Sequence, residues 1–222
     1  MKTFSDLISN NIGTTGNYKT MSISASKILA TVALLLAFSL SSFAAEQKAV
    51  FAGGCFWGVE AVFEHVKGVI AVRSGYAGGT SETANYGDVS RGDTRHAESV
   101  EIRFDPAKVT YEQLLNVFFV VAHDPTEVNR QGPDVGTQYR SAIFYMNASQ
   151  RKSADAFIAA LNTSKAFDRP VATEVVPFVA FFEAEEHHQD YLKRNPDDPY
   201  IVYNDIPKLA ALKQKFPALY RQ

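Results

Sequence analysis

Cysteine is nearly absent from this sequence, and its charges are almost balanced. There is one cysteine in 222 residues, at position 55. A single cysteine excludes an internal disulfide framework and leaves a thiol that is either buried and inert or reactive. Lys and Arg number 22, Asp and Glu number 24, and the formal net charge is -2. This balance provides no positive field for nucleic acid, so we expect no nucleic-acid partner.

The apolar run near the N-terminus is too short to cross a membrane. It covers residues 28–38, about half of what a spanning helix needs. Lys27 precedes the run, and small residues, among them Ser42 and Ala44, follow it. Basic, apolar and small segments in this order are typical of a secretory signal peptide. We therefore expect cleavage after Ala44, export, and a periplasmic location.

This interpretation divides the chain into two parts. Residues 1–44 are expected to be an N-terminal extension with the signal peptide, and residues 45–222 a single folded domain. Met21 as the true start would give the signal an ordinary length. An uncleaved membrane anchor is the alternative. We expect the mature protein to be a monomer without a membrane segment.

Strand and helix patterns alternate along the folded part, with uneven connections. Two stretches rich in Gly, Asp and Thr or Pro, 74–95 and 123–137, are expected to be long functional loops. These features favour an α+β two-layer sandwich, a ferredoxin-like plait with a mixed sheet, over a doubly wound parallel sheet. Periodicity and capping signals predict strands at 47–52, 69–72, 99–104, 139–145 and 171–176, and helices at 56–66, 110–121, 148–161, 185–192 and 209–216.

The cysteine lies where a predicted strand meets a predicted helix, in Gly53-Gly54-Cys55-Phe56-Trp57-Gly58. Backbone N–H groups at a helix start stabilise an anion, so we expect the pKa of the Cys55 thiol to fall below about 8.5 and the thiolate to form. Phe56 and Trp57 offer aromatic surface to a sulfur-bound methyl group. The alternative is a small buried cysteine packed among core aromatics.

The stretch Gly54–Glu60 resembles the signature of the A-type peptide methionine sulfoxide reductases. Further blocks resemble this family in the same order along the chain, over about residues 49–195. Several blocks in order are far more specific than one short motif. These blocks are 74–79, Asn85-Tyr86, 92–98, 123–125, 131–141 and 184–192.

The resemblance implies a role for each matching residue. Cys55 matches the nucleophile, and Glu98 matches the acid that protonates the departing oxygen. A carboxyl group donates at neutral pH only if burial raises its pKa. Tyr86 and Tyr139 match tyrosines that hydrogen-bond the sulfoxide oxygen, and Asp134 matches a hydrogen-bonding aspartate at the site. On residue type alone, Glu98 would be a solvated surface group and Tyr139 a strand-packing side chain.

The resemblance also implies the remaining partners. Phe56 and Trp57 match the methyl-binding surface. The substrates are the S epimer of methionine sulfoxide, free or in oxidised proteins and peptides, and no cofactor or metal is used. The nucleophile becomes a sulfenic acid. Many family members then form a disulfide with cysteines near the C-terminus, but this chain has none there. We therefore expect an external thiol reductant, such as thioredoxin, glutaredoxin or glutathione.

Three other interpretations of the sequence are weaker. A single-cysteine thiol peroxidase would need a threonine and a proline just before the nucleophile, and residues 51–54 provide neither. A non-catalytic module could bind methionine-rich peptides through Phe56 and Trp57. A metal site at His187 and His188 is disfavoured, because adjacent helical residues point about 100° apart.

Overall fold

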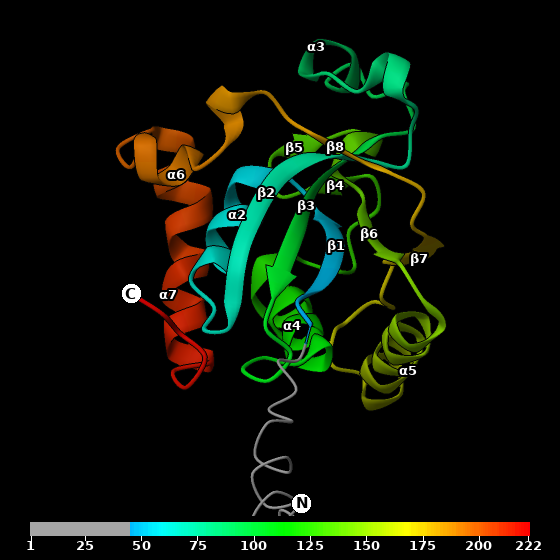
Figure 1. Cartoon of the computed structure of the whole chain (residues 1–222), viewed down its shortest axis with the longest axis vertical. Helices are drawn as coiled ribbons and strands as arrows, with labels where there is room; N and C mark the ends of the chain where they lie inside the picture. Colours follow the sequence, from blue (N-terminus) through cyan, green and yellow to red (C-terminus); the bar gives the residue numbers. More distant parts are fainter. Residues whose placement is uncertain (1–44) are drawn as a thin grey trace, which may run out of the picture. The chain divides into compact units, whose positions relative to one another are not determined.

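A computed structural model describes residues 45–222. Its centre is a six-stranded sheet in the order β7-β6-β1-β3-β2-β8 (Figure 1). The strands are β1 Gln47–Gly53, β2 Val69–Ala77, β3 Ala97–Phe104, β6 Ser141–Tyr145, β7 Glu174–Pro177 and β8 Phe181–Glu183, and a separate hairpin joins β4 Arg130–Gln131 to β5 Asp134–Val135.

The sheet is mixed, as the sequence predicts. The pairs β1–β3, β1–β6, β2–β3 and β2–β8 are antiparallel, whereas β6 and β7 are parallel. Alternate residues of each strand face opposite sides: Phe51 belongs to one core cluster and Val50 to another. The mixed α+β class is therefore confirmed.

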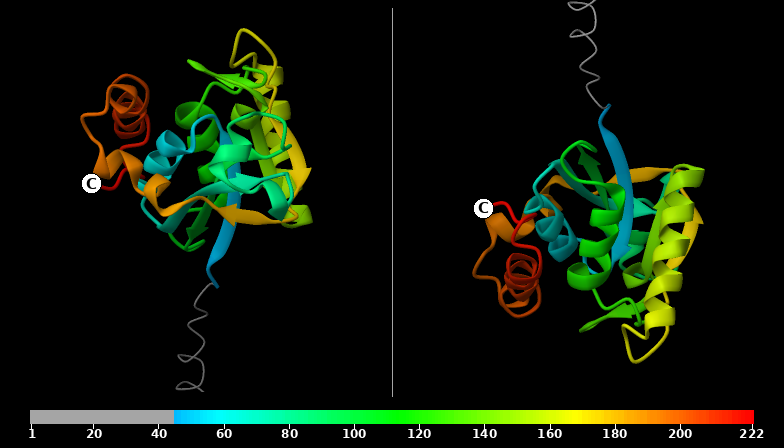
Figure 2. Two further views of the ribbon diagram at one scale, coloured as in Figure 1. Left: turned by 90° about the horizontal axis from the view of Figure 1, so that it is seen from above. Right: turned by 90° about the horizontal axis from the view of Figure 1, so that it is seen from below.

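The long helices contribute to a single large core on one face of the sheet. They are α2 Phe56–Glu64, α4 Tyr111–Val117, α5 Ala148–Ser164 and α7 Ile206–Lys215. Phe51, Ile102 and Ile143 point from the strands into this core, and all three are fully buried. Figure 2 shows α7 (red) and α5 (yellow-green) on opposite sides of the domain. The helix α2, which follows the cysteine, packs beside α7 (Figure 1).

The other face of the sheet carries smaller side chains. Val50, Ala52, Ala77, Ala97 and Ala142 form a second cluster with Phe144. The segment between β7 and β8 crosses this face (Figure 1), and Phe178 and Phe181 pack against the cluster. No long helix contributes to this second cluster among the residues described.

Several predicted boundaries hold, and the reasons are local. The Thr110 side chain accepts from the Gln113 N–H and the Gln113 side chain from the Thr110 N–H, a capping box that opens α4. The Asn147 side chain caps α5 by accepting from the Gln150 N–H, whereas the Gln150 side chain accepts from the Met146 N–H. After Val117 the chain continues as a π-helical turn, η2 Phe118–Ala122, so the helical stretch ends close to the predicted residue 121.

Two predicted elements are wrong. The loop predicted from residue 74 begins later, because 74–77 continue β2 and pair with β3 and β8. The helix predicted at 185–192 is broken into a 3-10 turn, η4 Glu186–His188, and a short α6 Tyr191–Arg194. Asp190 between them has a left-handed backbone, with φ 51°. The buried Gln189 amide bonds to the backbone of Ser74, which fixes the break.

The predicted signal segment, residues 1–44, lies outside the described residues, which begin at Ala45 directly after the predicted cleavage site. Within 45–222, none of the helices combines the length and apolar character that crossing a membrane requires.

Candidate active site

The cysteine lies at the junction that the sequence predicts. β1 ends at Gly53, and Cys55 is the N-cap of α2. Between them Gly54 has φ +90°, a conformation that L side chains rarely adopt. A Cβ at Gly54 would lie 2.5 Å from the Gln131 side chain. Glycine is therefore required at this turn, and the turn places the sulfur at the start of the helix.

The predicted thiolate is wrong for the free protein. Cys55 is 8% exposed. Burial raises the pKa of its thiol well above the ordinary value, and the Glu98 and Asp205 carboxyl groups raise it further. The Trp57 N–H at the helix start lowers this pKa, as the sequence argument requires, but by less than burial raises it. At neutral pH the resting group is consequently a thiol.

Glu98 comes from the start of β3, on the same face of the strand as Val100 and Ile102. Only 2% of it is exposed. Its Oε2 accepts a hydrogen bond of 3.0 Å from the Phe56 N–H, at the first residue of α2. Burial raises the pKa of Glu98 to about 8, and Asp134 adds to this while the Phe56 N–H opposes it. The carboxyl group therefore carries a proton at neutral pH.

One cavity of about 180 Å³ brings the predicted residues together. All seven side chains predicted from the sequence line it, and Tyr200 is an eighth that the sequence analysis missed. The lining residues are Cys55, Phe56, Trp57, Tyr86, Glu98, Asp134, Tyr139 and Tyr200.

The indole of Trp57 is fixed from two sides. Its ring stacks on Tyr191 with centroids 3.6 Å apart and an angle of 5° between the planes. Its Nε1–H donates to the His188 Nδ1 at 3.2 Å. His188 is buried, and its ring also contacts Phe56 and Tyr86. The broken segment 184–191 thus supplies the support for the aromatic wall.

The two predicted tyrosines come from short helices on the loops. Tyr86 begins α3 Tyr86–Val89, after the cap Asn85, and its N–H donates to Glu185 at 2.8 Å. Tyr139 ends the 3-10 turn η3 Thr137–Tyr139, so the strand predicted to start there begins at Ser141 instead. Burial raises the pKa of both phenols, and both remain hydrogen-bond donors at neutral pH.

Asp134 and Tyr200 form a hydrogen-bonded pair at the cavity. Asp134 begins β5, and the Tyr200 hydroxyl donates to its Oδ2. Burial raises the pKa of both side chains. Tyr200 is the N-cap of the π-helical turn η5 Ile201–Asp205 in the C-terminal segment, eight residues after the last block that resembles the family, 184–192. No spacing signal in the sequence could have placed it here.

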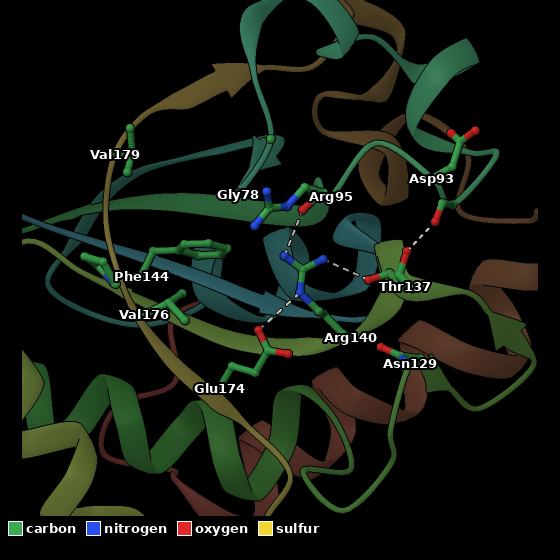
Figure 3. Close-up of a pocket in the computed structure, with 13 residues that line it drawn as sticks. Gly78, Asp93, Arg95, Asn129, Thr137, Arg140, Phe144, Glu174, Val176 and Val179 are labelled. Atoms are coloured by element: carbon green, nitrogen blue, oxygen red, sulfur yellow. Dashed lines mark hydrogen bonds and ion pairs between the residues drawn. The ribbon is translucent and has the colours of Figure 1, made fainter.

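A larger cavity, of about 580 Å³, lies elsewhere (Figure 3). It opens on the second face of the sheet, beside Phe144 and Val176, and Arg140 lies at its centre. Arg140 already donates to the carbonyl oxygens of Thr137 and Arg95 and pairs with Glu174 at 3.4 Å. No cysteine, histidine or tyrosine lines this cavity, so it lacks a group for sulfur chemistry.

A metal site needs several convergent ligands in the described part of the chain. No group of three or more His, Cys, Asp or Glu residues there is arranged to hold a metal ion. His188 instead accepts from Trp57, and the His187 ring lies against it, tilted by 41° with centroids 4.1 Å apart.

Comparison with known proteins shows which family the chain resembles over most of its length. The family model described as peptide methionine sulfoxide reductase matches residues 47–219. Peptide methionine sulfoxide reductase MsrA 2 of Synechocystis is 57% identical over 170 residues, 77% of this chain and 79% of the relative. The MsrA 2 of Mesorhizobium japonicum is 56% identical over 176 residues, 79% of this chain and 90% of the relative. Reduced Mxr1 from Saccharomyces cerevisiae superposes with a TM-score of 0.64 and 33% identity, covering 68% of this chain and 87% of Mxr1.

Proposed function

The chain belongs to the peptide methionine sulfoxide reductase family, and on this premise we propose how its residues carry out the reaction. The protein is an oxidoreductase that reduces methionine sulfoxide to methionine and so repairs oxidised proteins, without a prosthetic cofactor. Its substrate in this proposal is the S epimer, free or within oxidised proteins and peptides.

One observation carries the proposal: a thiol and a protonated carboxyl group line the same cavity. Cys55 and Glu98 do so, next to Phe56 and Trp57. A sulfoxide has an electrophilic sulfur and a basic oxygen, so its reduction needs a nucleophile and a proton donor. The aromatic side chains offer a surface to the methyl group. Each part of the substrate therefore has a matching group.

In the first step the Cys55 Sγ bonds to the sulfoxide sulfur while Glu98 gives its proton to the oxygen. The hydroxyl then passes to Sγ as the sulfur–sulfur bond breaks, and methionine leaves. The thiol proton replaces the one that Glu98 gave. Sγ is oxidised to a sulfenic acid, the substrate sulfur is reduced, and no proton is gained or lost overall.

The phenols stabilise the oxygen during this step. Tyr86 and Tyr139 both line the cavity and stay protonated, so their hydroxyl groups can donate to an oxygen that gains negative charge. Asp134 accepts from Tyr200 and so fixes a third phenol on the cavity wall. In our proposal Asp134 orients Tyr200 and does not transfer a proton.

Regeneration of the thiol needs an external partner. The sequence holds no second cysteine, so an intramolecular disulfide is impossible. Two external thiols convert the sulfenic acid into the Cys55 thiol, one disulfide and one water. A thioredoxin-like protein, a glutaredoxin or glutathione supplies them.

The finer features of the chain are also part of the proposal. The strand order β6-β1-β3-β2 with antiparallel pairing supports a ferredoxin-like plait, to which β7 and β8 are added. Residues 45–222 form the catalytic domain and 1–44 an extension with a signal peptide. The cut after Ala44 falls ahead of β1 and leaves the sheet intact. The order of basic, apolar and small segments before this cut supports export to the periplasm. The mature protein is a monomer.

The test is an activity assay on the purified domain 45–222 with each epimer of methionine sulfoxide. Dithiothreitol serves first as the reductant, followed by glutathione, glutaredoxin and thioredoxin. We expect methionine from the S epimer alone, and none with Cys55→Ser, because a hydroxyl cannot form the sulfenic acid. Near-ultraviolet circular dichroism of Cys55→Ser checks that the fold is kept.

The rival functions give different results in this assay. A peptide-binding module would bind the sulfoxide without producing methionine. A thiol peroxidase would consume peroxide and leave both epimers unchanged. Turnover by folded Cys55→Ser equal to that of the wild type would remove Cys55 as the nucleophile.

A further inference from the structure

The C-terminal segment places an ion pair against the start of α2, outside the set of residues that line the catalytic cavity. The Lys208 Nζ lies 3.0 Å from the Asp205 Oδ1. Asp205 is the N-cap of α7 and Lys208 belongs to its first turn. The Asp205 side chain is fully buried and that of Lys208 is 19% exposed. Both charged groups are therefore largely shielded from water.

Gly58 shows how close the ion pair lies to the catalytic helix. A Cβ at Gly58 would lie 2.0 Å from the Asp205 Oδ1 and 2.7 Å from the Lys208 Nζ. Only glycine leaves room for both head groups here. Residues three apart at a helix start share one face, with Cβ atoms about 5–6 Å apart. Because Gly58 is three residues after Cys55, the ion pair occupies the face of α2 on which Cys55 begins.

The groups that act on the sulfur come from several elements. Glu98 on β3 and Asp205 at the end of η5 raise the pKa of the Cys55 thiol, whereas Lys208 on α7 lowers it. The Lys208 ammonium also lowers the pKa of Asp134. The other titratable side chains around the cavity are the phenols Tyr86, Tyr139 and Tyr200. Lys208 is thus a cation that acts on both the nucleophile and the opposite wall.

The second oxygen of Asp205 is a further observation. The Oδ2 atom is buried and has no hydrogen-bond partner among the described residues. An unpartnered buried carboxylate oxygen costs free energy, so packing alone does not account for the group. The other oxygen, Oδ1, contacts the Lys208 Nζ, and this contact keeps the ammonium group at the start of α2.

We propose that Lys208, anchored by Asp205, is a positioning residue that stabilises the negative charge on the Cys55 Sγ as the sulfur attacks the sulfoxide. This inference rests on the proposed function. It explains how a thiol buried beside two carboxyl groups loses its proton when substrate is bound. At an effective dielectric constant of about 20, the attraction between unit charges about 6 Å apart changes an equilibrium constant by on the order of a hundredfold. Asp205 acts on the sulfur in the opposite direction and more strongly than Lys208, so Lys208 compensates part of the Asp205 charge, and we expect about a tenfold loss when the ammonium is removed.

The test compares Lys208→Met with Lys208→Arg, which keeps the charge, and with Lys213→Met. Lys213 is an exposed lysine on the same helix. Because Cys55 is the only thiol in the sequence, the rate of alkylation by iodoacetamide as a function of pH reports its ionisation alone. We expect Lys208→Met to be alkylated about tenfold more slowly at pH 8, and its kcat to fall by a similar factor with KM unchanged. Lys208→Arg is expected within about threefold of the wild type, and Lys213→Met equal to it.

Alkylation and kcat of Lys208→Met equal to the wild type would overturn the inference. Wild-type protein that reduces neither epimer would instead refute the proposed function, and the alkylation profiles would still be readable. Lys208→Gln serves as a second neutral variant. Loss of the native near-ultraviolet signal in both neutral variants would make the ion pair a requirement of the fold and would also overturn the inference.

Discussion

At the scale of single residues, the site depends on two side chains that both hold protons before substrate arrives. Burial raises the pKa of the Cys55 thiol and of the Glu98 carboxyl group, the latter to about 8. An ionised Glu98 would raise the pKa of the thiol further. The neutral carboxyl group therefore serves the reaction twice, because it supplies the proton and keeps a negative charge away from the sulfur.

The first prediction concerns Glu98→Gln. Glutamine has nearly the same shape and its carbonyl oxygen can still accept from the Phe56 N–H, but it cannot transfer a proton. We expect kcat with the S epimer to fall by about 10²- to 10⁴-fold, the usual contribution of a general acid. The assay with dithiothreitol measures this. A rate within threefold of the wild type would remove Glu98 as the acid.

The pH dependence follows from the same group. Glu98 is protonated below pH 8 and ionised above it, so kcat/KM of the wild type should decrease as the pH rises through about 8. The ionisation of Cys55 acts in the opposite direction, but its pKa is raised well above the ordinary value and its effect comes later. The residual activity of Glu98→Gln should not decrease in this range. The same decrease in that variant would assign it to another group.

The sequence predicted the identity of these residues but not their protonation. The helix start does act on Cys55, through the Trp57 N–H. The sequence could not show that the folded protein buries the sulfur and surrounds it with carboxyl groups. Asp205 lies 150 residues further along the chain, and only the folded structure places it there. Burial outweighs the local effect of the helix.

At the scale of elements, α2 joins the nucleophile to the C-terminal segment. Glycine inside a helix costs about 1 kcal/mol relative to alanine. Gly58 is nevertheless in the first turn of α2, because Asp205 and Lys208 occupy the space that a side chain would need. α7 can therefore pack this closely on α2 only because Gly58 has no Cβ.

Gly58→Ala should therefore lower the stability of the domain. The added Cβ would meet the Asp205 Oδ1 at 2.0 Å, so the ion pair must move. We expect a loss of about 1–3 kcal/mol in the free energy of unfolding, the range for overpacking, despite the better helix propensity of alanine. Urea denaturation measures it. The matched control is Gly87→Ala in α3, whose Cβ would meet only the Asn85 Oδ1 at 3.4 Å. Equal stability of the two variants would contradict the close approach.

Elements with a strong local signal were predictable, whereas glycine-rich stretches were not. The capping box at Thr110 and the side-chain cap at Asn147 mark the starts of α4 and α5 because the caps are made by neighbouring residues. Gly75 suggested a loop, yet it lies within β2. A Cβ there would meet the Phe182 carbonyl oxygen at 2.3 Å, so this glycine serves a close approach of strands. Such a contact between distant residues leaves no local pattern.

At the scale of the whole molecule, the sheet brings together segments that are far apart in the sequence. The cavity takes Cys55 from the β1–α2 junction, Glu98 from β3, Asp134 and Tyr139 from the loop before β6, and Tyr200 from the C-terminal segment. The ordered blocks of the sequence predicted the first four. Tyr200 and the ion pair of Asp205 with Lys208 follow only from the way the last segment packs on α2.

The molecule as a whole has one thiol, which limits what it can do without a reductant. Each chain can reduce one sulfoxide and then stops as a sulfenic acid, because no second cysteine can resolve it. A chain that forms an internal disulfide would also release one methionine for each pair of thiols, but it would stop as a disulfide. The sulfenic acid as the final state therefore follows from the cysteine content of the entire chain.

The most direct measurement mixes reduced protein with excess S epimer in the absence of any thiol and counts the methionine formed per chain. We expect one methionine per chain, together with one added oxygen atom on Cys55 that dimedone traps and mass spectrometry locates. No methionine, or an oxygen atom located on another residue, would contradict the assignment of Cys55 as the group that takes the oxygen from the sulfoxide.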